Sequence, residues 1–252
     1  GNRHGDLRWT FGFNHFENDG HPQSFVTSSR GTTAAGAGDI AVTGYRWDRN
    51  PKNADRLILG ATGMDHTVQD NAKVKLAYDF SPASRLTYTL GRWQGDSKAG
   101  VDPYLRDALG RPVYSGNVNI DGMRYTLAAT ALQLSRREEE HWMNSLAYRF
   151  DPKLGGDWAF EMAVTDYNIA RDQTRKPTVA LPAADAGGAG QIQRQDGTGW
   201  NTADVRADWR PQQGRLGHEL AFGYHFDQHV LKDRTFDTAN WRSGTEDALR
   251  SG

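Results

Sequence analysis

The chain contains no cysteine among its 252 residues, which excludes disulfide scaffolds and thiolate metal sites. It also lacks an excess of either charge, with 30 basic and 31 acidic residues, so it has no basic footprint for nucleic acid. No stretch approaches the roughly 18–20 apolar residues of a membrane-spanning helix. The first residues, GNRHGDLRWTFGF, lack the basic, apolar and small-residue succession of a signal peptide.

Hydrophobic residues are scarce for a chain of this size. They make up 37% of the sequence, and the mean hydropathy is -0.75, whereas a soluble domain of this length normally builds a substantial apolar core. Aromatic residues nevertheless reach 11%, which argues against disorder.

The large apolar residues come in alternating order, as the segment NAKVKLAYDFSPASRLTYTLGRW at residues 71–93 illustrates. Its first half places apolar residues on one parity, and the break at 81–84 is followed by Leu86, Tyr88 and Leu90 on the same pattern. This alternation predicts a β-hairpin with one apolar face and one polar face. The apolar residues of the first half are Ala72, Val74, Leu76, Tyr78 and Phe80.

Seven such segments are predicted along the chain. Their opposite parity carries polar and often charged residues, such as Arg8, Lys73, Lys75, Arg206 and Asp208. Outside the hairpin above, the apolar parity comprises Leu7, Trp9, Phe11 and Phe13; Trp142, Leu146, Tyr148 and Phe150; Trp158, Phe160, Met162 and Val164; Ala203, Val205, Ala207 and Trp209; and Leu220, Phe222, Tyr224 and Phe226.

The connections between these segments alternate between short and long. The short ones are expected at 81–84, 151–156 and 211–217, and the long ones at 17–70, 95–140 and 171–198. This asymmetry is typical of an antiparallel up-and-down barrel in an outer membrane, with short periplasmic turns and long extracellular loops. The predicted fold class is therefore all-β, a transmembrane β-barrel of which this chain supplies about seven strands. A soluble sheet whose aromatic face is its core is the alternative, because alternation alone shows only that one face is dry.

Aromatic residues gather near both ends of the predicted strands, where we expect them at the two membrane interfaces. Those near the short turns are Phe80, Phe150, Trp158 and Trp209, and those near the long loops are Trp93, Trp142, Tyr167 and Trp200. The segment RREEEHWMNSLAYRF is predicted to be a strand, with a helical turn before Trp142 left open, and Glu138–Glu140 is interpreted as a solvated extension of that strand.

No local pattern indicates catalysis. His225, Asp227 and His229 share one parity with Glu219, but an ordinary polar wall is favoured over a metal site. The glycine-rich stretches at 36–38 and 187–190 are interpreted as flexible loops rather than phosphate-binding loops. No Ser–His arrangement suggests a hydrolase. We therefore expect no enzyme activity, no cofactor and no metal site.

Four stretches resemble the barrel region of TonB-dependent outer-membrane receptors of the iron-complex, or siderophore, type. They are HFENDGHPQSFV, LAYDFSPASRLTYTLGRW, PVYSGNVNIDGMRYTL and EEEHWMNSLAYRF. The resemblance is diffuse and covers most of the chain. It implies that residues 1–252 are part of a receptor barrel domain in a Gram-negative outer membrane, with lipid and lipopolysaccharide as neighbours. The plug domain and the C-terminal strands are expected to be absent from this segment.

The same resemblance implies transport of a ferric siderophore or similar metal complex, driven by the TonB protein through a plug segment. Loop residues with aromatic or cationic ends suit such ligands, and the candidates are Trp93, Tyr104, Arg106, Tyr114 and Arg175. Two other functions remain open, a passive porin-type barrel and a soluble β-sheet binding module.

Overall fold

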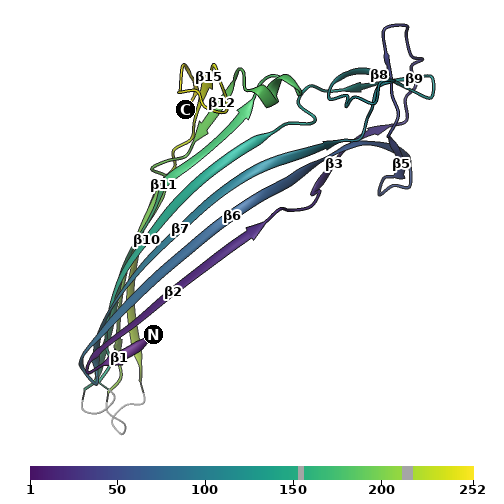
Figure 1. Ribbon diagram of the computed structural model, residues 1–252. Coiled ribbons are helices and arrows are strands. Elements are labelled where there is room, and N and C mark those ends of the chain that lie inside the picture. The colour runs from purple at the N-terminus through teal and green to yellow at the C-terminus, as the bar shows by residue number, and fades with distance from the viewer. Residues whose placement is uncertain (153–155, 212–217) are drawn as a thin grey trace.

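The computed structural model describes residues 1–152, 156–211 and 218–252, and its dominant feature is one large antiparallel sheet. Seven long strands lie in sequence order across it, each antiparallel to its neighbour (Figure 1). This confirms the predicted all-β antiparallel meander. The strands are β2 (Leu7–Asn18), β6 (Asp55–Ser81), β7 (Ser84–Pro103), β10 (Ser135–Phe150), β11 (Trp158–Pro177), β13 (Gly199–Trp209) and β14 (Leu220–Val230).

Within the described residues the sheet does not close into a barrel. The short strand β1 (Asn2–His4) pairs with the start of β2 at one edge, and among the described strands β14 pairs with β13 alone at the other. Among the residues that the structure describes, no helix is both long and apolar enough to cross a membrane.

The connections are asymmetric, as the sequence predicted. The turn between β6 and β7 lies at one end of the sheet, and the loops after β2, β7 and β11 lie at the opposite end (Figure 1). The predicted turns at 151–156 and 211–217 fall partly and mostly outside the described residues, respectively.

The strands are longer than predicted. β6 begins at Asp55 instead of residue 71, β7 continues to Pro103, and β11 continues to Pro177. Only about half of each expected long loop, at 17–70 and 95–140, lies outside the strands. Strand β10 includes Arg136–His141, so the helical turn before Trp142 is wrong. These extensions lack apolar alternation, which signals a strand only where one of its faces is dry.

Cross-strand register joins the apolar parities into one continuous face. A single row of paired residues crosses all seven strands and contains Trp9, Leu76, Tyr88, Leu146, Val164, Ala203 and Phe226. None of the residues that the structure describes covers this face: Phe11, Leu76, Phe160 and Phe222 are 59%, 41%, 39% and 56% exposed. They do not converge in a sealed interior.

The opposite face is polar and held by ion pairs. Asp79 accepts from Arg8 at 2.7 Å and from Arg85 at 2.5 Å, and Arg206 pairs with Asp208 at 3.0 Å. A hollow of about 870 Å³ on this face is lined in part by charged residues, including Lys75, Arg85, Arg149, Glu161, Arg206 and His225.

The larger of two caps sits at the loop end of β6 and β7 and has a conventional apolar core. It is formed by residues 24–61 and 101–134, which include β3 (Ser24–Ser29), β5 (Arg46–Arg49) and a separate sheet of β4 (Ile40–Ala41), β8 (Gly116–Ile120) and β9 (Met123–Leu127). The buried side chains are Val42, Leu57, Leu59, Leu105, Val113, Val118, Ile120, Tyr125, Leu127 and Leu132.

The smaller cap lies above β11. It contains a 3-10 helix, η1 (Ala183–Ala186), and the strands β12 (Gly190–Arg194), β15 (Arg234–Thr238) and β16 (Leu249–Ser251). Strand β12 pairs with the upper part of β11. Trp241 is 5% exposed in this cap, and its Nε1 donates to the carbonyl oxygen of Ala184 at 2.8 Å.

Candidate functional site

A row of aromatic rings crosses the polar face near the loop end of the sheet. Trp93 and His141 lie 4.8 Å apart between ring centroids, and His141 and Tyr167 lie 5.7 Å apart. Tyr167 then stacks on Trp200 at 4.0 Å with an interplanar angle of 13°, and His229 lies 6.0 Å beyond Trp200. The row thus links β7, β10, β11, β13 and β14.

This row corrects the predicted upper ring of membrane-interface aromatics. Trp93, Tyr167 and Trp200 have the parity of Thr89, Thr165 and Thr202, and therefore belong to the polar face. Only Trp142 of the four lies on the apolar parity. All four aromatics near the short turns, Phe80, Phe150, Trp158 and Trp209, do lie on the apolar parity.

Glycine at position 95 gives the Trp93 indole its place. A Cβ on Gly95 would lie 3.0 Å from Cη2 of Trp93, so the indole extends along its own strand over the bare backbone of Gly95. His141 of β10 is the cross-strand partner of Trp93, which places its ring beside the indole.

A β-bulge places an acidic residue beside this histidine. Glu140 pairs with Arg171 while the next residue, His141, pairs with Ile169, so β11 carries one extra residue, Ala170, at this point. A bulge changes which side chains face a given side of the sheet. Beyond it, Asp172 lies directly opposite Glu139.

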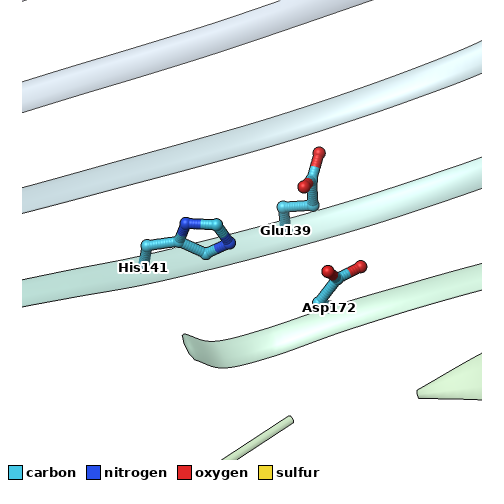
Figure 2. Close-up of side chains that lie close together, drawn as sticks. All are labelled: Glu139, His141 and Asp172. Atoms are coloured by element: carbon cyan, nitrogen blue, oxygen red, sulfur yellow. The ribbon is translucent and has the colours of Figure 1, made fainter. Parts of the chain in front are cut away.

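Glu139, His141 and Asp172 form a compact cluster (Figure 2). One potential ligand atom from each residue lies within 4.8 Å of the other two. The side chain of Asp172 is 5% exposed and that of Glu139 is 15% exposed. The strand extension predicted at Glu138–Glu140 is therefore confirmed as strand, but its side chains are largely removed from solvent.

Arg137 bridges the two carboxylates of the cluster. Its Nε and Nη2 donate to the two carboxylate oxygens of Asp172 at 3.0 and 2.8 Å, and Nη2 lies 2.9 Å from Glu139 Oε1. Burial raises the pKa of Glu139 because it disfavours the charged form. With one guanidinium for two carboxylates, ionised carboxylates would leave the cluster net negative.

His141 is held by one nitrogen and unpartnered at the other. Its Nδ1 lies 2.6 Å from the hydroxyl oxygen of Tyr167, while Nε2 is enclosed and has no hydrogen-bond partner. Burial lowers the pKa of His141, which keeps the ring neutral near pH 7. If Nδ1 carries the proton and donates to Tyr167, Nε2 presents a free lone pair to the two carboxylates.

The five predicted ligand-binding residues do not come together in one site. Trp93 is in the ring row. Tyr104 lies in the larger cap beneath the Arg46 guanidinium, 5.6 Å from the ring centroid. Arg106 donates to the carbonyl oxygens of Pro103 and Leu105, which is a structural role.

The two other predicted ligand-binding residues also make contacts within the caps. Tyr114 packs against the core of the larger cap. Nη1 of Arg175 donates to the carbonyl oxygen of Gly244 at 2.8 Å, and burial lowers the pKa of this guanidinium. Ligand binding by any of the five stays a prediction.

The sequence candidates that were set aside as metal ligands are also spread out. His225 pairs with Asp204 at 2.7 Å. Among the described residues, His225, Asp227 and His229 do not belong to a set of three side chains close enough to hold one metal ion. In the 187–190 stretch, residues 187–189 lie outside any helix or strand, as predicted, whereas Gly190 begins β12. A Cβ there would lie 2.5 Å from the carbonyl oxygen of Lys176 and would overlap Trp241.

The Glu139–His141–Asp172 cluster was missed from the sequence. Glu139 and His141 are two apart on a strand, which places them on one face, and that signal was readable. The position of Asp172 was not, because it depends on the bulge at Ala170.

The comparisons with known proteins give no family assignment. No protein-family model matches the chain, and no curated protein or solved structure matches it either.

Proposed function

We propose that this chain forms part of the wall of an outer-membrane β-barrel, with its apolar face against lipid and its polar face toward a water-filled interior. The observation that carries the proposal is the continuous apolar face across seven strands, whose side chains are exposed and covered by none of the described residues. A face of this size in contact with water would be strongly unfavourable, because each Å² of apolar surface costs about 25 cal/mol.

The edges of the apolar band support a bilayer as the missing neighbour. On β2 the upper edge is Phe13, which pairs with Ala72 of β6. On β14 the upper edge is Phe226, and the row of paired residues through Phe226 reaches β6 at Leu76. Measured along β6, the upper edge therefore shifts from Ala72 to Leu76, which is 76 − 72 = 4 residues toward the turn end.

The lower edge shifts by the same amount and in the same direction. On β2 the lower edge is Leu7, and the row of paired residues through Leu7 reaches β14 at Tyr224. On β14 the lower edge is Leu220, which lies 224 − 220 = 4 residues closer to the turn end than Tyr224. Four residues at about 3.3 Å across six strand spacings of about 4.8 Å correspond to a strand tilt of about 25°. A tilted sheet that crosses a layer of fixed thickness must have a band sheared at both edges.

The height of the band agrees with this arrangement. On β6 it runs from Ala72 to Phe80, eight steps that rise about 24 Å at that tilt. Outer-membrane barrels carry an apolar band about 25 Å tall. The turn between β6 and β7 would face the periplasm, and both caps would face the cell exterior.

Within this class, we propose a TonB-dependent receptor for ferric siderophores or similar metal complexes. The support is the sequence resemblance, together with two folded caps at the end where such a receptor meets its ligand. An uptake assay with the intact gene tests this. Deletion should abolish uptake of a radiolabelled ferric siderophore, and loss of TonB in the host should do the same.

A passive porin is the second candidate, favoured by the charged hollow on the polar face. In that case deletion would reduce diffusion of small solutes, and loss of TonB would have no effect. A soluble binding module predicts a monodisperse protein without detergent or lipid, a result that would contradict both barrel functions.

A further inference from the structure

We propose that Glu139, His141 and Asp172 form a binding site for a divalent transition-metal ion of the zinc type on the polar face of the sheet. The inference concerns local geometry and does not depend on the transported ligand. One imidazole nitrogen and two carboxylate oxygens are ligands that zinc accepts, with water completing the coordination.

The backbone already places all three donor residues next to one another on one face of the sheet. Glu139 and Asp172 are cross-strand partners, and His141 follows Glu139 by two residues on the same face. Tetrahedral zinc with bonds of about 2.0–2.2 Å needs donor atoms roughly 3.3–3.5 Å apart, against the present limit of 4.8 Å. Side-chain rotation of Glu139 supplies the contraction, while the strands stay in place.

The orphaned nitrogen of His141 is the independent sign of a ligand. A buried polar atom without a partner costs about 1–3 kcal/mol, yet Nε2 is enclosed and unpaired. In Figure 2 the far edge of the His141 ring faces Glu139 and Asp172. The contact of Nδ1 with Tyr167 resembles the outer hydrogen bond that orients metal-bound histidines.

Arg137 is the competitor for this site. Its guanidinium occupies the carboxylates that the metal would use, but its side chain is 44% exposed and can swing into solvent. Removal of this cation should therefore strengthen metal binding. If the cluster serves only as an ion pair with Arg137, the expectation is the opposite. Removal of Arg137 would then disrupt the cluster without creating any affinity for a metal ion.

The test is a titration of the folded protein, in detergent or lipid, with Zn²⁺ by calorimetry and with Co²⁺ by visible absorption. We expect one ion per chain, with Co²⁺ bands typical of low coordination number. His141→Gln should weaken binding by about tenfold or more, while the matched variant His225→Gln, on β14, should leave it unchanged. Arg137→Gln should tighten binding.

Near-UV circular dichroism and thermal unfolding of each variant separate loss of a ligand from loss of the fold. Asp172→Asn gives a second ligand variant if His141→Gln unfolds. The proposal is overturned if the native protein binds neither ion at about 1 mM. It is equally overturned if the folded His141→Gln and Asp172→Asn variants bind as the native protein does.

Discussion

The two halves of strand β6 place similar side chains in opposite surroundings. Leu57 and Leu59, in the upper half, are 0% and 1% exposed in the core of the larger cap. Leu76 and Phe80, in the lower half, are 41% and 60% exposed on the apolar face. The difference teaches that one strand can lie in two environments: side chains of the cap shield the upper half from water, whereas the lower half is left exposed and, in the arrangement proposed above, is covered by lipid.

The largest effect is expected from Leu57→Ala, which tests the buried core of the larger cap. The side chain is fully buried, so its truncation should cost about 2–5 kcal/mol of cap stability through lost burial and a residual cavity. Hydrogen exchange should show faster exchange in residues 101–134 and unchanged protection in β11. The control, Leu109→Ala, removes a side chain that is 75% exposed in the same cap and should change stability by no more than about 0.5 kcal/mol.

The exposed apolar face, which we propose contacts lipid, is tested by Met162→Lys. Met162 is 50% exposed on the apolar parity of β11, and a lysine near the bilayer midplane costs about 2–4 kcal/mol. Urea unfolding from lipid vesicles measures this loss. Its matched control is the next residue, Ala163→Lys, which points to the polar face opposite Asp204. Equal losses for the two variants would contradict the assignment of the faces.

A smaller effect is expected in the other cap from Gly190→Ala. The new Cβ would lie 2.5 Å from the Lys176 carbonyl oxygen and overlap Trp241, so the backbone must shift. We expect about 1–3 kcal/mol of destabilisation, seen as faster proteolysis of residues 177–194. Gly12→Ala, where a Cβ meets nothing within 4 Å, should not increase proteolysis there.

The smallest effect is expected for Trp200→Ala in the ring row. Its stack on Tyr167, at 4.0 Å, should contribute about 0.5–1.5 kcal/mol beyond burial. Near-UV circular dichroism should lose the signal of the coupled pair. Trp47→Ala removes an exposed ring of β5 that contacts no other aromatic ring among the described residues, and it should leave that signal intact. Loss of the signal in both variants would contradict its assignment to the stacked pair.

The strands of the lower half of the sheet could be predicted from the sequence because one of their faces is apolar and the other polar, so that apolar and polar residues alternate there. Phe11, Leu76 and Phe222 were placed on one face, and the structure confirms that face. The upper halves of β6, β7 and β11 were not readable, since both of their faces are polar or contact loops, and period-two order disappears.

The errors at the candidate site have different causes. Trp93, Tyr167 and Trp200 were assigned to the membrane interface from their nearness to loops, although their parity already placed them on the polar face. The meeting of Glu139 with Asp172 could not be predicted, because a bulge of one residue reverses the face of everything beyond it.

The most direct test of the central claim uses the absence of native cysteine. Single cysteines at each position from 158 to 166 of β11 would carry nitroxide labels in the bilayer-reconstituted protein. The collision rates with oxygen and with a water-soluble nickel chelate would then be measured. We predict high oxygen access at Phe160, Met162 and Val164, and high nickel access at Glu161, Ala163 and Thr165. If the even-numbered labels are instead immobile and closed to both reagents, the apolar face is a protein core and the membrane assignment is wrong.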